Sequence, residues 1–274
     1  MSKTKVLIVT QEMNPYTVGS EIAEIARRLP QHIQEQGMEI RILMPKYGTI
    51  NERRHRLHEV VRLSGMNIIV DDDDFPLIIK VASVQGARMQ VYFLDNEDFF
   101  KRKAIFKDAD EKAFEDNPDR MIFFCKGVVE TVKKFGWAPD IVHCHGWMTS
   151  LIPLYLKTAY KSEPLFEDAK VVTSIYNNPI ENVFSDDFIL KASINDLEEK
   201  DLSAFNYDGG ISLINGASAF SDALIIGSEG YEDDIVDAAE KAGKPILPHQ
   251  SPETYLSAYI NFYNSLLEQE ETVS

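Results

Sequence analysis

Apolar runs and amphipathic segments alternate over the first part of the chain. Residues 5–10 form a mostly apolar run, which is typical of a strand buried on both faces of a parallel sheet. Residues 22–33 carry apolar side chains at helical spacing, Gly37 stands where this helix would stop, and Pro30 is expected to kink or split it. Residues 40–45 form a second apolar run. This order predicts a βαβ unit with a right-handed crossover.

In the following part of the chain, the spacing of apolar residues changes from that of helices to that of short strands. Four β-type runs are separated by turn residues, at positions 58–63, 66–70, 77–84 and 89–94. We expect them to form an antiparallel or edge extension of the sheet. The four successive aspartates 71–74 could also bind a divalent cation, but cation ligands need a spacing that lets them converge, so a solvated turn is favoured.

The second half of the chain returns to alternating strands and helices. Asn117-Pro118-Asp119 supplies a capping residue, a first-turn proline and an early acid, so it predicts a helix start, and Gly136 predicts the helix end. Further strands are predicted at 140–145, 170–175 and 223–226, with helices at 211–219 and from Ser251 onward. The pattern predicts an α/β domain whose mostly parallel sheet has helices on both faces.

Composition narrows the functional classes. The chain has 274 residues, is 44% apolar and 26% charged, and carries 28 Lys and Arg against 44 Asp and Glu, for a net charge of -16. An acidic field repels nucleic-acid phosphates and anionic membrane surfaces, so neither is an expected partner. The first apolar run is too short for a signal peptide. Two cysteines, Cys125 and Cys144, give no disulfide framework, and we expect a protein of the reducing cytoplasm.

Polar residues concentrate where the strand at 140–145 gives way to the next helix. Ligands gather at the carboxyl ends of parallel strands, so this is the best functional lead in the sequence. His143 and His145 are two residues apart and project to one side of the strand, and Trp147 follows them. Cys144 faces the other side, where we expect a buried, inert thiol.

Several short fragments occur in a characteristic order over most of residues 1–235. They are Glu12…Pro15-Tyr16 with Leu29-Pro30, the stretch Arg41 to Gly48, the stretch Val91 to Asn96, Pro139 to His143 with His145 and Trp147, Ala219 to Asp222, and Ser228…Tyr231. Each fragment alone is weak evidence of a relationship to any family. Together they resemble the amino-terminal half of bacterial glycogen synthases and plant starch synthases.

The resemblance implies a fold and an activity. Enzymes of this family transfer glucose from ADP-glucose to the non-reducing end of an α-1,4-glucan with retention of configuration, between two Rossmann-like domains. Residues 1–235 would be the N-terminal Rossmann-like domain, and residues 236–274 a linker, a C-terminal helix packing on the same domain, and a disordered tail. The family's second domain supplies an arginine, a lysine and a glutamate to the site, and no sequence resembling it follows here.

The loop after the first strand departs from the family pattern. The family has a lysine, a threonine or valine, and two glycines near the donor phosphates. Aligned without gaps, the corresponding positions here are Val18, Gly19, Ser20 and Glu21. Val18 lacks the lysine's positive charge, and Glu21 places a carboxylate where the resemblance puts a phosphate. We therefore predict a degenerate donor loop.

A second departure lies beyond the histidines. Gly146 and Met148 stand where the family has an aspartate and a histidine, and Tyr176 replaces the histidine beside the transferred sugar. A tyrosine can hydrogen-bond and stack on a sugar, but it does not exchange protons near pH 7 as histidine does. We assign no catalytic residue. The candidate sugar-cleft residues are Tyr16, His143, His145, Trp147, Tyr176 and Asn177.

Three other chemistries have weaker support. The two histidines lack a third ligand at zinc spacing, so a hydrogen-bonded structural or sugar-lining pair is favoured over a metal site. Gly227-Ser228-Glu229-Gly230 matches the nucleophile elbow of a serine hydrolase only in part. The first strand is not followed by the Gly-x-Gly-x-x-Gly of dinucleotide-binding proteins. We expect neither a metal nor a cofactor.

The sequence thus predicts a single doubly wound, Rossmann-like α/β domain with a small β extension at residues 58–94 and a C-terminal helix. We expect a glycogen- or starch-synthase homologue of glycogen metabolism, truncated to the N-terminal domain and inactive or weak alone on ADP-glucose, hence a pseudoenzyme. Whether it acts as an enzyme stays open at this point. The alternative is a non-catalytic glucan-binding or regulatory protein, whose partner is glucan or a protein at the former domain interface.

Overall fold

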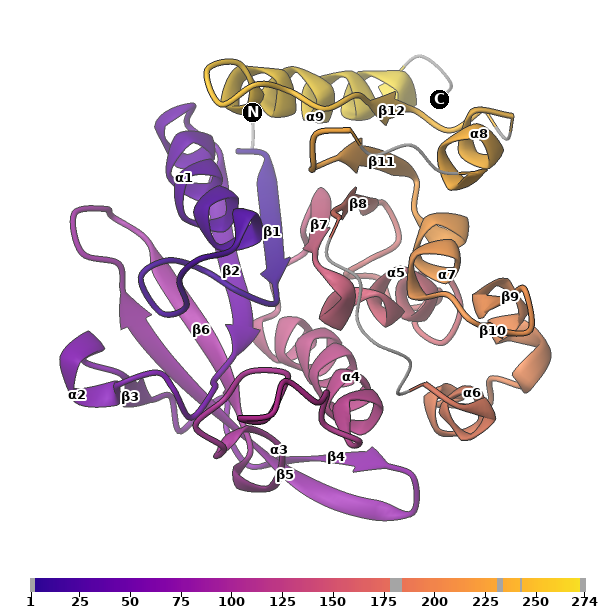
Figure 1. Ribbon diagram of the computed structural model, residues 1–274. Coiled ribbons are helices and arrows are strands. Elements are labelled where there is room, and N and C mark those ends of the chain that lie inside the picture. The colour runs from indigo at the N-terminus through magenta and orange to yellow at the C-terminus, as the bar shows by residue number, and fades with distance from the viewer. Residues whose placement is uncertain (1–2, 178–183, 231–233, 242, 272–274) are drawn as a thin grey trace.

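The computed structural model describes residues 3–177, 184–230, 234–241 and 243–271. Within these ranges, a 10-stranded sheet has the order β12-β11-β8-β7-β1-β2-β6-β5-β3, with β4 paired to β5 (Figure 1). Seven strands form its parallel part: β1 (Lys5–Thr10), β2 (Glu39–Pro45), β6 (Gln90–Asp95), β7 (Ile141–His145), β8 (Lys170–Ile175), β11 (Ala223–Ile226) and β12 (Ile246–Leu247). The strand order reverses at β1, which is the doubly wound arrangement that the sequence predicts.

The predicted β extension is present at one edge of the sheet. It consists of β3 (His58–Glu59), β4 (Met66–Val70) and β5 (Asp73–Ser83), all joined by antiparallel pairing. Strand β6 belongs to both parts, because it pairs antiparallel with β5 and parallel with β2. Asp71 and Asp72 form the exposed turn between β4 and β5, with Asp71 at a φ of 57°, and Asp73 and Asp74 are the exposed first residues of β5. No cluster of metal-ligating side chains occurs among the described residues.

Helices cover both faces of the sheet. Helices α1 (Glu21–Glu35) and α9 (Tyr255–Glu271) contact each other on one side, and α4 (Asn117–Phe135), α5 (Leu151–Lys157) and α7 (Leu213–Phe220) pack together on the other (Figure 1). The remaining elements are α2 (Glu52–His55), α3 (Glu97–Phe100), α6 (Asp186–Ala192), α8 (Asp234–Lys241), the 3-10 helices η1 (Trp147–Thr149) and η2 (Glu199–Phe205), and the hairpin of β9 (Asn206–Tyr207) and β10 (Gly210–Ile211).

The predicted helix ends have the expected chemistry except at the start of α4, where the predicted cap Asn117 is the first helical residue and the preceding Asp116 makes no side-chain capping hydrogen bond. Helix α1 begins after Ser20, whose Oγ accepts a hydrogen bond from the Ala23 N–H at 3.1 Å. Helix α4 carries Pro118 in its first turn and ends at Gly136, which has a φ of 60°. Pro30 does not split α1, which runs through it as one helix with the proline on its buried face.

No helix in the described part of the chain is long and apolar enough to cross a bilayer. The predicted tail, residues 272–274, and Tyr231 lie outside the described residues. The helix expected from Ser251 onward is α9, which begins at Tyr255. Its buried side chains include Tyr259, Tyr263 and Leu266, so this last helix contributes to the same core as the sheet.

Candidate functional site

The carboxyl ends of four neighbouring strands bring the predicted site residues to one edge of the sheet. The register aligns Thr10 with His145, and His145 with Ser174. Farther along, Ile175 is opposite Ile226. The loops that follow β1, β7, β8 and β11 therefore meet at this edge, as expected for ligand sites in open α/β sheets.

The two histidines are buried beneath α9. His143 Nδ1 lies 2.5 Å from the Tyr263 hydroxyl, and its Nε2 lies 2.7 Å from Ser174 Oγ. His145 Nδ1 lies 2.7 Å from the Tyr176 hydroxyl, and the two imidazole centroids are 3.8 Å apart. Both histidines are 0% exposed. The pair is thus part of a hydrogen-bonded network in the core that joins β7, β8 and α9.

Burial fixes the charge of this histidine pair. It lowers the pKa of His143 well below the ordinary value, with a smaller contribution from neighbouring His145. It also lowers the pKa of His145 to about 3. Both imidazoles are therefore neutral near pH 7 and offer neither a cation for a phosphate nor a proton donor poised at that pH. Among the described residues, the buried Nε2 of His145 has no hydrogen-bond partner.

Tyr176 occupies the space above the end of β11. A Cβ added to Gly227 would lie 2.4 Å from Tyr176 Cε1, so this position needs glycine to let the tyrosine ring pack. Tyr176 is 4% exposed, and burial raises the pKa of its hydroxyl well above the ordinary value. The phenol therefore stays protonated at neutral pH, where it can form hydrogen bonds but does not act as a base.

The predicted donor loop is joined to the end of β11 by a hydrogen bond. Ser228 Oγ donates to the Glu21 carboxylate at 2.7 Å and accepts from the Asn177 backbone N–H at 2.8 Å. Glu21 is the first residue of α1, where the helix dipole favours a negative charge. Gly19 has a φ of +97°, and Val18 is 73% exposed. A carboxylate thus occupies the helix terminus at which an anion would otherwise bind.

These contacts also argue against the alternative that Ser228 is the nucleophile of a serine hydrolase. The hydroxyl of Ser228 contacts a carboxylate and a backbone amide, whereas a serine nucleophile needs a base such as histidine within hydrogen-bond reach. His145 instead binds Tyr176. These hydrogen bonds join the start of α1 to the segments that follow β8 and β11, and they do not form a hydrolase triad.

A small cavity opens beside Trp147 and Tyr176. Its volume is about 180 Å³. Its other lining residues are Gly146, Ser150, Thr173, Ser174, Ile175, Phe184, Ile211, Ser212, Leu213, Ile214 and Ala217. Trp147 is held by tilted and edge contacts with Phe106 and Phe184, at centroid distances of 5.0 and 6.1 Å. The cavity thus combines aromatic faces with several hydroxyls, a mixture that both stacks and hydrogen-bonds.

The six predicted cleft residues are only partly brought together. His143, His145 and Tyr176 share one network, and Trp147 and Tyr176 line the cavity. Asn177 is exposed and contacts Ser228 through its backbone. Tyr16 lies elsewhere, with its ring against Phe93 and His55 at 4.8 and 5.0 Å. Burial raises the pKa of the Tyr16 hydroxyl to about 12.

Residues that sequence reasoning missed complete the network. Tyr259 and Tyr263, four residues apart on α9, pack against His143, with centroid distances of 5.9 and 5.7 Å. Their spacing places both rings on one face of the helix. This spacing was the feature of the sequence that could have identified them as partners of the site. Ser174 joins His143 from the neighbouring strand. The docking of α9 and the pairing of β7 with β8 bring these three side chains to His143, and neither is encoded locally in the sequence.

The structure defines a doubly wound α/β protein whose candidate ligand site lies at the carboxyl edge of the sheet. Residues 5–245 match the family model described as starch synthase catalytic domain. The chain is 37% identical over 235 residues to a glycogen synthase of Chlorobium limicola, covering 85% of this chain and 47% of that protein. A glycogen synthase of Chlorobaculum tepidum is 37% identical over 241 residues, covering 86% and 48%. The chain belongs to the family of the starch synthase catalytic domain.

A solved structure supports the fold. The catalytic domain of starch synthase IV from Arabidopsis thaliana, bound to ADP and acarbose, superposes with a TM-score of 0.73 at 18% identity, covering 91% of this chain and 52% of that one. The family resemblance and the Rossmann-like fold are thus confirmed. The chain spans about half the length of the relatives it matches.

Proposed function

We propose that the chain is a glycogen- or starch-synthase homologue of glycogen metabolism that, by itself, transfers glucose from ADP-glucose weakly or not at all. The observation that carries this proposal is the carboxylate of Glu21 at the N-terminus of α1, held by Ser228 at 2.7 Å. The remaining structural support comes from the loop before it and from the buried histidine pair.

The loop geometry disfavours a diphosphate. A helix N-terminus binds anions through its free backbone N–H groups and positive dipole end. Here the Ser20 hydroxyl already accepts the Ala23 N–H, and the Glu21 carboxylate carries the negative charge at that end. Val18 projects into solvent where the family has a cation. A diphosphate at this helix terminus would therefore face the like charge of Glu21 without the cation that the family places in this loop.

The two buried histidines and Tyr176 are also poorly suited to proton transfer. A general acid or base works best when its pKa lies near the working pH. Burial moves the pKa of both histidines far below that range and the pKa of Tyr176 above it. Tyr176 lines the cavity and can hydrogen-bond to a sugar, whereas the two histidines are fully buried, and none of the three supplies a proton donor or acceptor at neutral pH.

A Glu21→Gln substitution tests the electrostatic argument. The wild-type chain should incorporate no measurable glucose from ADP-glucose into glycogen, and calorimetry should show weak or no ADP-glucose binding. Removing the carboxylate's charge should strengthen ADP-glucose binding several-fold, because a charge repulsion worth about 1 kcal/mol changes affinity about fivefold. The matched control is Glu35→Gln at the opposite end of the same helix.

Two results would contradict this proposal. Turnover by the purified wild-type chain at ordinary enzyme rates, about 1 s⁻¹ or faster, would show a competent donor site. Equal effects of the Glu21 and Glu35 substitutions would show that the Glu21 carboxylate has no special relation to the ligand. Thermal unfolding of each variant confirms that the comparison is made between folded proteins.

A second candidate function is non-catalytic glucan binding, favoured by the cavity beside Trp147. Aromatic rings next to serine and threonine hydroxyls suit a sugar, whose faces are apolar and whose edges are polar. Trp147→Ala and Tyr176→Ala should each reduce co-sedimentation with glycogen by about tenfold, as expected for loss of a hot-spot aromatic. Tyr92→Ala, which removes a half-buried tyrosine of β6, is the control. Unchanged co-sedimentation in both cavity variants would exclude this binding site.

A further inference from the structure

A second and larger depression lies at the ends of β2 and β6, apart from the cavity beside Trp147. Its volume is about 610 Å³. The loop after β2, helix α2 and the loop around α3 supply most of its lining. Strand β5 adds Lys80, and the end of β6 adds Asp95. None of these residues takes part in the donor loop or the histidine network described above.

The charge of this depression is opposite to that of the chain. Five of its lining side chains are cationic and three are carboxylates, whereas the whole chain has 28 basic and 44 acidic residues. The cationic residues are Lys46, Arg53, Lys80, Lys101 and Lys103. A concave surface of one sign concentrates ligands of the other sign. Since the rest of the molecule repels anions, a local excess of positive charge needs a specific explanation.

Lys46 and Lys80 form the floor of the depression and are held in place. Lys80 Nζ lies 2.9 Å from Glu52 and 2.8 Å from Asp95, and Lys46 Nζ lies 2.6 Å from Glu52. The side chains of Lys46 and Lys80 are only 13% and 20% exposed. A lysine ammonium has three donors, so each of these two groups keeps donor capacity beyond its close carboxylate contacts.

Hydrogen bonding keeps Lys80 and Glu52 charged at neutral pH. Burial alone would lower the pKa of Lys80, but its hydrogen bonds with Asp95 and Glu52 outweigh burial and raise that pKa. Burial would likewise raise the pKa of Glu52, yet the hydrogen bonds from Lys46 and Lys80 outweigh it and lower that pKa. The Lys80 ammonium thus retains its charge although it is largely withdrawn from solvent.

Lys103 fixes one wall of the depression to the loop after β2. Its Nζ donates to the Gly48 carbonyl at 2.6 Å. A Cβ on Gly48 would lie 2.1 Å from the Lys101 carbonyl oxygen, so only glycine allows these two loops to approach so closely. The two lysine-bearing segments are therefore packed backbone against backbone.

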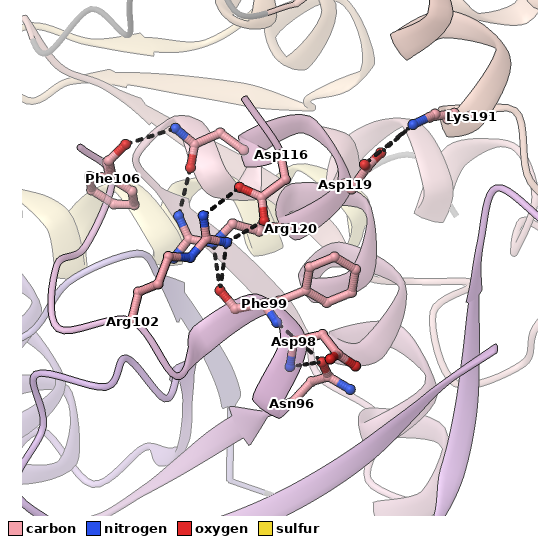
Figure 2. A network of polar contacts seen from close by, with 10 residues as sticks. Asn96, Asp98, Phe99, Arg102, Phe106, Asp116, Asp119, Arg120 and Lys191 are labelled. Carbon is pink, nitrogen blue, oxygen red and sulfur yellow. Dashed lines mark hydrogen bonds and ion pairs between the residues drawn. The ribbon is translucent and has the colours of Figure 1, made fainter. Parts of the chain in front are cut away.

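The segment that carries Lys101 and Lys103 is anchored to α4. Figure 2 shows Arg102 paired with Asp116, and Arg120 bound to the Phe99 carbonyl through its Nε at 2.9 Å. Arg120 also donates to Asn117 Oδ1 at 2.6 Å and is 0% exposed. These contacts hold the segment that carries Lys101 and Lys103, so the cationic side chains are presented from a supported loop.

We propose that this depression binds a small phosphorylated metabolite through its phosphoryl group. Five cations against three carboxylates leave a formal excess of two positive charges, which matches a phosphate monoester with about −1.5 to −2 charge at pH 7. Lysine binds phosphate as a point charge, and several lysines can address the three terminal oxygens together. A long polyanion is disfavoured because the chain as a whole carries a net charge of -16.

Calorimetric titration tests the proposal with three probes: inorganic phosphate, glucose 1-phosphate and glucose. We expect saturable binding of at least one phosphate-bearing probe and none of glucose. Comparison of the first two shows whether free phosphate or a phosphorylated organic molecule is preferred. Lys46→Gln and Lys80→Gln should each weaken the binding about tenfold, which corresponds to about 1.4 kcal/mol. The control is Lys112→Gln, an exposed lysine paired with Glu115 outside the depression.

A second measurement uses the wild-type chain and does not depend on variant folding. Limited acylation of lysine amines, followed by mass spectrometry, should show that the phosphate-bearing probe protects Lys46 and Lys80 and leaves Lys112 unprotected. Absence of binding by both phosphate-bearing probes at millimolar concentration would overturn the proposal. An equal loss of binding in all three lysine variants, or protection of Lys112 alone, would also overturn it, because either result shows non-specific charge attraction.

Discussion

At the scale of single residues, the sheet edge is dominated by polar groups that have been withdrawn from water. His143 bonds with both of its ring nitrogens, to Tyr263 and Ser174, and His145 bonds with one, to Tyr176. A buried imidazole that is hydrogen-bonded and neutral contributes to folding only while it stays uncharged. The histidines therefore link the stability of the domain to pH.

The sign of this pH dependence follows from the lowered pKa values. Unfolded histidines bind protons below about pH 6.5, whereas folded His145 does so only near pH 3, and the pKa of His143 is also well below 6.5. Between these values the unfolded state binds more protons. The free energy of unfolding should therefore fall as the pH drops from 7 toward 5, by up to about 1.4 kcal/mol per pH unit for each histidine.

Urea denaturation at a series of pH values measures this slope. His145→Gln removes the titrating group and should make the free energy of unfolding less dependent on pH over this interval, even if the variant is less stable at pH 7. His58→Gln, a substitution at an exposed position of β3, is the control and should leave the slope unchanged. A His145→Gln slope equal to that of the wild type would contradict the assignment of the pH dependence to this buried pair.

At this scale the sequence predicted which side chains of one strand share a face, but not which residues from distant parts of the chain contact them. The strand period alone predicts that His143 and His145 share a side. It does not reveal Tyr263, which lies 120 residues away and reaches His143 through the docking of α9. The charge change from a family lysine to Val18 was visible in the sequence, but the Glu21–Ser228 hydrogen bond depends on a contact between residues 207 positions apart. The sugar-binding roles of the six candidate residues stay predictions.

At the scale of secondary structure, the long periodic elements were predictable, whereas several of the short ones were not. Helices α1 and α4 and strands β1, β2, β7 and β8 have clear periods and terminal signals, because burial of one face or of both faces sets their residue pattern. The helices α6 and α8 and the strand β12 span 7, 8 and 2 residues, which is too short for a period to stand out. Their conformation depends on neighbours in the tertiary structure.

Several elements differ in detail from expectation, including the run predicted as a strand at 58–63, which is a strand only at His58–Glu59. Two of the differences have a clear physical reason. Proline inside a helix removes a backbone donor, which usually kinks or ends the helix, yet α1 continues because its apolar face, including Pro30, is packed in the core. Strand β5 begins at Asp73, earlier than its apolar run, because Asp73 and Asp74 pair with Val70 and Ile69 across the turn. Tertiary packing and pairing thus extend elements beyond what local propensity indicates.

At the scale of the whole molecule, both tryptophans belong to one continuous core. Trp137 follows α4 and donates through its indole N–H to Glu39 at 2.6 Å, whereas Trp147 lies beyond the end of β7 beside Phe106. The same cluster of buried residues includes both indoles and extends from β1 to α9. A chain of 274 residues is near the upper size for a single hydrophobic core, so cooperative unfolding is a real test of this architecture.

The chain has only two tryptophans, which flank β7, so each end of this strand can be followed by fluorescence in a single-tryptophan variant, Trp137→Phe or Trp147→Phe. If the sheet, α4 and α9 form one cooperative unit, fluorescence and far-ultraviolet circular dichroism should give the same urea midpoint within each variant. The two variants can differ in stability, so the comparison is made within each protein and not between them. A fluorescence transition that precedes the dichroism transition in one variant would show that its tryptophan reports a separately unfolding region, and the single-core description would then fail.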